Sequence, residues 1–550
     1  MNFLVTNFKI SKQDPKYSYV ENVNFKCLYE EKSTISHFTN ENFSFMDGFL
    51  INHKDTNVTT AHNLGIVSQK IDLSWPLPDY LSGSFGVAVA KKDRVVIAND
   101  VIGVYPIYYY FKRNKLVVSN SLQLVQTVLN CDFDEVAIAQ RLLNNEGVIY
   151  GNRTILSEVK RLLPGEKIEF STRKNIVLKS YDNRLFNEVG ENKIKHEDLK
   201  LYWSLYKKIT SRLYRQNSKT YLALSGGMDS RILLGAIDKK NKVNCVTYGS
   251  KDFYEVKIAK KLSKVKGFSF ENYSNYDLFF PELKLLEDCI KNTESVYVVN
   301  WLEILVEFIQ DRSKSIWFGD MCEALPGRNI DKYNSRKARQ KNFLNNYLLD
   351  KDYFFQNANS DNFGKFKDET KRNLLRKLSK KKFDNLELSL NFKDFIQTTK
   401  KDLDLLYKRI ESHSIPYVEL YKELFRWYTH SRIPMGKQIL QCNSTYKALC
   451  PSMDSSLLVK TSNIHPNLRL NYRFMSKLFE RFDDLKALNK IPVNQSPLVP
   501  RNSSVLLSFL VWGLRSKIDQ ILIKRIMRKK NPDLRYRLFK SLNWIKVYQN

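Results

Sequence analysis

Residues 220–231 read TYLALSGGMDSR, and this stretch decides the fold of the second half of the chain. An apolar strand runs into two adjacent glycines, and a helix is predicted from Ser230 to Ile237. The glycines let a phosphate approach the backbone, and the start of the helix presents N–H groups and a positive dipole end to the same point. Ser225 and Ser230 add hydroxyl donors, whereas Asp229 would repel a bare phosphate and so favours a bridging Mg²⁺ ion. The stretch predicts a phosphate-binding loop; the alternative is a glycine turn with capping Asp and Ser residues.

Further strand and helix units follow this loop along the chain. Val243–Thr247 is a second apolar strand, Tyr254–Lys264 is a predicted helix, and Ser315–Phe318 is a third strand that ends at Gly319 and Asp320. Alternation of this kind predicts a parallel sheet with its ligands at the carboxyl ends of the strands. The sequence contains no GxxxxGK[ST] motif, so ordinary transfer of a γ-phosphoryl group is not favoured.

The two ends of the chain have different patterns. Short apolar strands separated by Lys, Arg, Asn and Gly turns dominate residues 1–185, which are predicted to form a sheet-rich layered domain. The polar segment Asp182–Glu197 is the predicted boundary. A second domain is expected at 198–500, becoming helical after about Lys332, and a basic helical extension at 501–550.

Composition narrows the class of protein. The net charge of +31 attracts anions, although a Lys-rich surface that is simply solvated explains it equally well. Seven scattered cysteines without a CxxC pair indicate neither a zinc site nor a disulfide framework, and a reduced, cytoplasmic setting is expected. The N-terminus lacks the pattern of a signal peptide, and the longest apolar stretch near the C-terminus, Val505–Leu514, is too short to span a membrane.

The phosphate loop resembles that of the asparagine synthetase family, which reads SGGxDS. Residues 315–327 are similar to that family's second motif, a strand followed by G[DE]GxDExxxG, with Gly319, Asp320 and Gly327 matching. Glu323 stands where the family has an Asp beside the metal and pyrophosphate, and Ala324 replaces the next acidic residue.

Other parts of the chain extend the resemblance from about Phe3 to Val499. Pro451–Asp454 is similar to the family's PFLD, with Leu449 in place of the arginine expected before it. Leu81–Phe85 is similar to LxGxFA, and Leu163–Gly165 to the LPPG turn. Similarity to DRxGxxPLYY is carried by Asp100, Gly103, Pro106, Tyr108 and Tyr109.

The resemblance implies an α/β and α+β protein. Its first domain would be a type 2 glutamine amidotransferase-like αββα sandwich of the N-terminal nucleophile (Ntn) type. Its second would be a parallel-sheet PP-loop domain, similar to adenine nucleotide alpha hydrolases, with a helical extension. The implied reaction activates a carboxylate as an acyl-AMP with release of pyrophosphate, and then transfers the acyl group to ammonia or an amine.

The resemblance also assigns roles to individual residues by their positions in the matching motifs. The residues implied to bind ATP are Leu224, Ser225, Gly226, Gly227, Asp229, Ser230, Tyr248, Phe318 and Gly319. Asp229 and Glu323 would hold Mg²⁺. Asp320 and Glu323 would be catalytic, with Asp320 taking the proton of the attacking amine. Lys490 is the nearest candidate in chain order for the family's C-terminal catalytic lysine, but its surroundings do not match and the role stays unassigned.

The glutaminase half of the resemblance is incomplete. Glutamine amidotransferases of this type use an N-terminal cysteine, but position 2 is Asn2 and no cysteine precedes Cys27. Ser82 stands where the family has a glutamine-binding Asp. Because an amide side chain cannot replace a thiolate nucleophile, glutaminase activity is expected to be lost, as in the β-lactam synthetases, which are similar to asparagine synthetases.

Three alternatives stay open: a PP-loop enzyme that modifies RNA, a non-catalytic nucleotide-binding descendant, and asparagine synthesis from free ammonia. The expected substrate is a carboxylate, either free or on a glycan or peptide, and nucleic acid is not the expected partner. The basic amphipathic segment Val505–Lys530 could contact an anionic membrane or serve as a docking helix. His430 could lie in the substrate cleft, but a position at the edge of the core is the more common one for a histidine.

Overall fold

A computed structural model defines the fold for most of the chain. The residues that it describes are 2–10, 15–31, 34–39, 42–55, 59–144, 147–171, 176–217, 219–249, 251–273, 287, 290–293, 314–321, 324–330, 345, 351–386, 388–491 and 493. The predicted extension at 501–550, its Val505–Lys530 segment, and Glu323 lie outside these residues.

The second half of the chain contains a five-stranded parallel sheet in the order β15-β14-β13-β16-β17. The strands are β13 (Thr220–Ala223), β14 (Val243–Tyr248), β15 (Ser269–Tyr273), β16 (Ser315–Trp317) and β17 (Lys447–Leu449). The three strands predicted from the sequence are therefore confirmed, and β15 and β17 are additional. Chain order reverses between β13 and β16, which makes the edge above these two strands a topological switch point, where open sheets of this type bind ligands.

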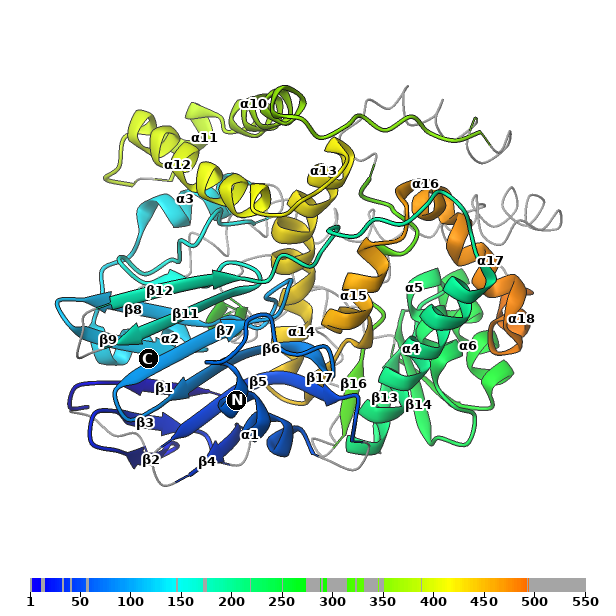
Figure 1. Ribbon diagram of the computed structural model, residues 1–550, viewed down its shortest axis with the longest axis horizontal. Helices are drawn as coiled ribbons and strands as arrows, with labels where there is room; N and C mark the ends of the chain where they lie inside the picture. The colour runs from blue at the N-terminus through cyan, green and yellow to red at the C-terminus, as the bar shows by residue number, and fades with distance from the viewer. Residues whose placement is uncertain are drawn as a thin grey trace.

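Helices cover both faces of this sheet (Figure 1). On one face Leu222, Cys245 and Trp317 pack against helices from the start and the end of the domain. These helices are α4 (His196–Gln216), α5 (Met228–Ala236), α6 (Tyr254–Lys266), α17 (Arg473–Arg481) and α18 (Asp483–Asn489). On the other face Ala223 and Val246 pack against a helical layer. That layer includes α10 (Ser360–Arg376), α12 (Phe392–Glu411), α13 (Val418–Arg426), the π-helix Trp427–Met435 and α14 (Gly436–Asn443).

The first half of the chain contains two six-stranded antiparallel sheets. The first is ordered β10 (Lys160–Arg161), β8 (Tyr108–Lys112), β9 (Lys115–Ser119), β1 (Phe3–Thr6), β3 (Lys26–Tyr29), β2 (Ser18–Glu21). The second is ordered β12 (Ile176–Tyr181), β11 (Glu166–Ser171), β7 (Arg94–Asn99), β6 (Leu81–Ala90), β5 (Phe43–Asn52), β4 (Ile35–Phe38). Strand alternation sends one set of side chains from each sheet, including Phe3, Phe45 and Ile97, into a shared core.

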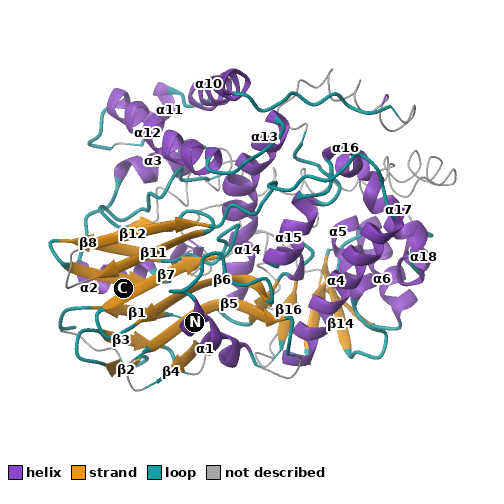
Figure 2. Cartoon of the chain, in the orientation of Figure 1, coloured by secondary structure: helices purple, strands orange, loops and turns teal. Residues whose placement is uncertain are grey.

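The outer faces of these two sheets are covered by helices. Leu122 and Val125 of α2 (Leu122–Leu129) pack on the first sheet, and α3 (Glu135–Leu143) lies beside it. Leu64 and Val67 of α1 (Thr60–Lys70) pack on the second sheet. The layers therefore run helix, sheet, sheet, helix. Figure 2 shows strands of both sheets on its left side. The sequence expectation of a sheet-rich layered first half is confirmed.

The two halves are continuous in the core. Segment 182–195, every residue of which is described, joins β12 to α4 without helix or strand. One apolar cluster nevertheless joins Val104 and Tyr105 to Leu424 and Ile439, and another joins Phe49 to the face of the parallel sheet. A polar linker in the sequence thus coexists with a buried interface between the halves.

Buried arginines of the second half hold turns of the first half. The fully buried Arg432 donates from Nε to the Gly103 carbonyl at 3.1 Å and also donates to the Leu162 carbonyl. Arg409 donates from Nε to the Pro164 carbonyl at 2.8 Å. Because burial of an unpaired guanidinium is unfavourable, these hydrogen bonds fix the turns against the helices.

Within the described residues, none of the helices combines the length and apolarity required to cross a membrane.

Candidate active site

The glycine loop lies at the switch point of the parallel sheet, between β13 and the start of α5. Leu224 continues β13 by donating its N–H to the Val246 carbonyl at 2.9 Å, and α5 begins at Met228. Ser225 Oγ lies 3.0 Å from Ser230 Oγ and accepts the Gly227 N–H at 3.1 Å. The two serine hydroxyls therefore shape the loop through contacts with each other.

Arg231 holds the loop from beneath. Its side chain is fully buried and donates to the carbonyls of Gly226 at 3.3 Å, Leu488 at 3.1 Å and Ile491 at 2.5 Å. The guanidinium thus joins the loop to the end of α18. Because this charge points into the protein, it positions the loop and does not face a ligand above it.

Gly319 brings the end of β16 against the start of α5. A Cβ at this position would lie 2.6 Å from the Ser230 nitrogen and 2.7 Å from the carbonyl carbon and oxygen of Asp229. Backbone of α5 this close to position 319 allows only glycine there. The two motifs that the sequence singled out separately, 225–230 and 319–320, therefore meet at one point.

The Pro451–Asp454 segment closes the same edge of the sheet. Ser452 Oγ donates to the Asp320 carbonyl at 2.6 Å, and Cys450 Sγ donates to it at 3.0 Å. These bonds fix the backbone of Asp320, the predicted proton acceptor. A third motif from the sequence thus joins the other two.

Asp454 extends this network to the first half of the chain. Its carboxylate caps α15 (Ser455–Ser462) and accepts from Ser82 Oγ at 2.8 Å. Since Ser82 donates to that carboxylate, it accepts in turn from His53 Nε2, at 2.7 Å. Burial lowers the pKa of His53, and Asp454 opposes this shift. The Ser82 hydroxyl is therefore part of the contact between the two halves.

Asp229 is paired with a residue that the sequence did not suggest. Arg328 Nη1 lies 3.2 Å from Asp229 Oδ2, and Arg328 Nε donates to the Tyr472 hydroxyl at 2.7 Å. The guanidinium also lies over the Tyr472 ring, 5.4 Å from its centre. A weak signal for Arg328 existed, since it follows the matching Gly327; Tyr472 had none.

The remaining residues that were predicted to bind the nucleotide occupy different environments. Leu224 and Phe318 follow β13 and β16, and their side chains are fully buried in the cores on opposite faces of the sheet. Their backbones border the switch point, so any contact with a nucleotide would be made mainly through backbone atoms. Tyr248 is buried at the end of β14 and is followed by Gly249, whose φ is +137°. Their roles in nucleotide binding stay predictions.

The donor atoms at the loop suit a cation whose coordination is completed by a bound ligand. Among the described residues no group of three or more His, Cys, Asp or Glu side chains could hold a metal. Mg²⁺, however, is commonly bound by one or two carboxylates together with water and the phosphates of its nucleotide. The Asp229 carboxylate, 27% exposed at the start of α5, fits that arrangement. The second predicted ligand, Glu323, lies outside the described residues.

The start of β1 holds no thiol. The Asn2 backbone N–H donates to Glu30 at 3.1 Å, and Cys27, the first cysteine in the sequence, is fully buried between the sheets. Burial raises the pKa of the Cys27 thiol, so it stays protonated and unreactive. Nearby, the buried Asp47 carboxylate accepts from Asn443 of the second half at 2.6 Å. This region makes a contact between the two halves.

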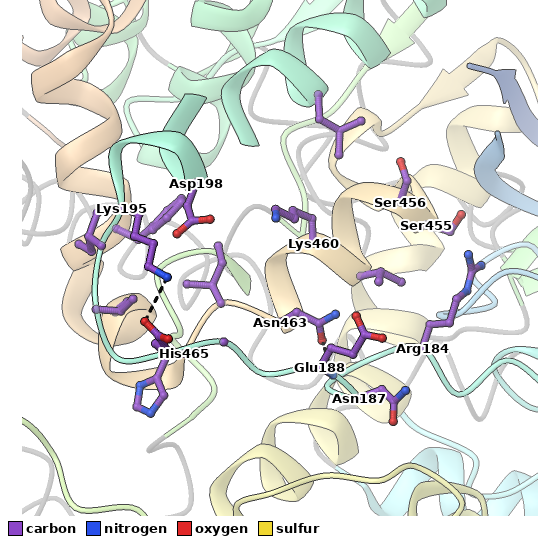
Figure 3. A pocket seen from close by; sticks show the side chains of 18 of the residues that line it. Arg184, Asn187, Glu188, Lys195, Asp198, Ser455, Ser456, Lys460, Asn463 and His465 are labelled. Carbon is purple, nitrogen blue, oxygen red and sulfur yellow. Dashed lines mark hydrogen bonds and ion pairs between the residues drawn. The ribbon is translucent and has the colours of Figure 1, made fainter. Parts of the chain in front are cut away.

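A large polar cavity lies elsewhere, beside α15 and the linker. It has a volume of about 610 Å³ and is lined by residues of segment 184–195, α4 and α15. Figure 3 shows Arg184, Ser455 and Ser456 at one end and Lys195 and Asp198 at the other. No residue of the glycine loop lines it. It is therefore separate from the site at the switch point.

Comparison with known proteins identifies a class for part of the chain. Residues 77–182 match the family model of a glutamine amidotransferase domain. That range contains β6 to β12, and with them Ser82, Gly103 and the Pro164 turn. This part of the chain is therefore similar to a glutamine amidotransferase domain. No curated protein sequence matches the chain.

Some solved structures show slight similarity. One is an allosteric regulatory enzyme of purine biosynthesis, with 8% identity, 49% of this chain and 74% of that chain covered, and a TM-score of 0.21. Another is a glutamine phosphoribosylpyrophosphate amidotransferase from B. subtilis with ADP and GMP, with 8% identity, 56% and 63% covered, and a TM-score of 0.18. A third is an NH₃-dependent NAD synthetase from Campylobacter jejuni with nitrate, with 14% identity, 39% and 96% covered, and a TM-score of 0.19. These overlaps are slight, and the function proposed below does not rest on them.

Proposed function

We propose that this chain is an ATP-dependent amide-forming ligase of the asparagine synthetase-like type. The observation that carries the proposal is the meeting of the glycine loop, Gly319 and the backbone of Asp320 at the switch point of a parallel sheet. Such an edge binds ligands, and backbone N–H groups at the start of a helix bind phosphates. The amidotransferase-like first half supports nitrogen-transfer chemistry.

In the first step, an oxygen of the substrate carboxylate attacks the α-phosphorus of ATP. A new C(O)O–P bond forms, the bond to the β-phosphate breaks, and pyrophosphate leaves with its electron pair. The loop N–H groups stabilise the charge that develops on the phosphates, and Asp229 would hold Mg²⁺. Mg²⁺ neutralises phosphate charge and orients the leaving pyrophosphate.

In the second step, ammonia or an amine attacks the acyl carbon of the acyl-AMP. The C–N bond forms, AMP leaves, and the nitrogen loses one proton. Asp320 is proposed to take that proton, since its backbone is fixed at this edge by Ser452 and Cys450. The nitrogen would come from solution or from an amine of the substrate. The first half is proposed to keep an Ntn-type fold without its nucleophile.

Asp229→Asn tests the proposal directly. It removes the charge that would hold Mg²⁺ with almost no change of volume, so exchange of pyrophosphate into ATP should fall by about 100-fold or more. The assay uses the full chain, Mg²⁺, ATP, labelled pyrophosphate and a panel of carboxylates: free aspartate, uronic acids and acidic peptides. Asp352→Asn is the matched control, since Asp352 forms a 2.8 Å ion pair with Arg473. Undiminished exchange in Asp229→Asn would remove the proposed role, and absence of exchange in wild type with every carboxylate would favour a non-catalytic nucleotide-binding protein.

The proposal also predicts the nitrogen source. Purified protein should release no glutamate from glutamine above background, because the start of β1 holds Asn2 and Cys27 is buried. Ammonium salts or a primary amine should support amide formation where glutamine does not. Glutamate release that follows the purified protein through a final column would contradict the loss of the nucleophile.

A further inference from the structure

We infer that Arg328 binds the phosphate groups of the nucleotide at the glycine loop, and that Asp229 holds its guanidinium in place until a divalent cation occupies Asp229. The inference rests on the part of the proposed function that places a nucleotide at this loop. It does not depend on which carboxylate is activated. It assigns a cationic side chain to a site where the chain-order candidate, Lys490, did not match.

The first support is location and access. The Arg328 guanidinium lies 3.2 Å from the Asp229 carboxylate, and Asp229 follows the glycine loop directly. The side chains of Arg328 and Asp229 are 37% and 27% exposed, so both are open to a ligand that enters from solvent. Arg231, the arginine within α5, is fully buried and turned toward backbone carbonyls. Of these two arginines, Arg328 is therefore the one whose positive charge can meet a phosphate above Asp229.

The second support is the rigid mount of Arg328. Gly327 has a φ of +61°, and a Cβ there would lie 3.1 Å from the Leu470 nitrogen. The chain before Arg328 therefore lies directly against residues 469–470. Arg469 donates to the Ala324 carbonyl at 3.0 Å and forms a buried pair with Glu423. The backbone that leads into Arg328 is therefore held at Ala324 and Gly327 by residues 469–470.

The third support is the arrangement around Tyr472. Tyr472 and Asn471 have φ values of +67° and +52°, a backbone conformation that is rare for residues other than glycine. Such strain is typically retained where function requires it. Here it places the Tyr472 hydroxyl 2.7 Å from Arg328 Nε and the ring under the guanidinium. Tyr472 thus fixes the orientation of the guanidinium plane.

Electrostatics explain why the ion pair would exchange partners. A guanidinium binds phosphate oxygens through strong, charge-assisted hydrogen bonds. A partly exposed ion pair such as Arg328–Asp229 contributes little stability, so new bonds to a phosphate readily offset its loss. The Asp229 carboxylate would hold Mg²⁺ when the cation is bound with the nucleotide, and the released Arg328 guanidinium would then meet the phosphates. Asp229 would then bind the nucleotide through the cation, and Arg328 would bind its phosphates directly.

A structural ion pair is the competing explanation, and two binding measurements separate it from the inference. The first is calorimetric binding of ATP with Mg²⁺ to the full chain. Arg328→Met should weaken ATP binding by at least about tenfold, the loss expected for one or two charge-assisted hydrogen bonds. Arg328→Lys should fall between this variant and wild type, and Tyr472→Phe should weaken binding less. Arg473→Met is the matched control, because Arg473 follows Tyr472 directly and pairs with Asp352; its ATP affinity should equal that of wild type.

The second measurement is binding of Mn²⁺ alone, in the absence of nucleotide. Arg328→Met should bind Mn²⁺ more tightly than wild type, since the Arg328 guanidinium then no longer competes for the Asp229 carboxylate. Opposite changes in the two affinities support the inference. Equal ATP affinity in wild type and Arg328→Met overturns it, as does a loss of both affinities together, which indicates a structural role.

The outcomes for the proposed function differ from these. If wild type binds ATP, Arg328→Met weakens that binding, and no carboxylate supports pyrophosphate exchange, the inference stands and the proposed reaction fails. If wild type exchanges pyrophosphate and Arg328→Met does so with the same affinity for ATP, the reaction stands and the inference fails. If wild type binds no ATP, both fail.

Discussion

Gly319→Ala is expected to abolish nucleotide binding, with a loss of affinity of about 100-fold or more, while the sheets remain folded. The added Cβ would meet backbone atoms of Ser230 and Asp229 at 2.6 to 2.7 Å, well inside normal contact. Neither side can yield through a side-chain rotation, so the end of β16 and the start of α5 must separate. This separation moves the loop N–H groups away from the position of the phosphates. Calorimetric titration with Mg²⁺ and ATP measures the loss.

Gly364→Ala is the control for this substitution. Gly364 lies in α10, and a Cβ there would meet nothing within 4 Å. Replacing a helical glycine that has room for a Cβ by alanine stabilises a helix slightly, so this variant should bind ATP as wild type does and melt at the same temperature or a little higher. Unchanged ATP affinity in a folded Gly319→Ala variant would show that the nucleotide does not lie between these two segments.

The sequence predicted those parts of the fold in which local pattern and tertiary packing agree. Strands β13, β14 and β16 are apolar because helices cover both faces of the sheet, and each is followed by glycine or a helix. Strand β15 reads SFENY and is an edge strand without a fully buried residue, so it carries no continuous apolar pattern. Strand β17 has only three residues and is defined by its pairing with β16.

The candidate site likewise contains residues that the sequence predicted and residues that it did not. Its loop is contiguous in sequence, so the glycines, Asp229 and Ser230 could be recognised from local chemistry. Arg328 reaches Asp229 across 99 residues, and Tyr472 reaches Arg328 across 144. Contacts at this separation depend on how β16 and the helices after β17 pack. Single-residue patterns carry no information about that packing.

Within the first half of the chain, residues 77–182 are similar to a glutamine amidotransferase domain. Its recognisable turns lie at the contact with the second half. Ser82 donates to Asp454, the Gly103 carbonyl accepts from Arg432, and the Pro164 carbonyl accepts from Arg409. Loss of glutaminase chemistry would leave these contacts necessary for stability. The turns are therefore constrained by burial and hydrogen bonding, independently of any glutaminase activity.

Glu423→Gln is expected to destabilise the protein by about 3–5 kcal/mol, the loss typical of breaking one side of a buried ion pair. Both carboxylate oxygens of Glu423 accept from Arg469 at 2.7 Å, and both side chains are fully buried. The substitution leaves a guanidinium in the core without its counter-charge, beside the Ala324 carbonyl to which it also donates. The second motif should therefore loosen together with the core. Urea unfolding followed by tryptophan fluorescence measures the change.

Two further variants decide whether the buried charge is the cause. Glu480→Gln removes a carboxylate from an exposed pair with Lys477 and should change the free energy of unfolding by no more than about 0.5 kcal/mol. Glu423→Leu combined with Arg469→Met replaces both charges by apolar groups and should recover a large part of the stability lost in Glu423→Gln, since no buried charge is left unpaired. A double variant as unstable as Glu423→Gln would instead attribute the loss to altered packing. The ion pair would then not be what holds segment 324–330 against residues 469–472.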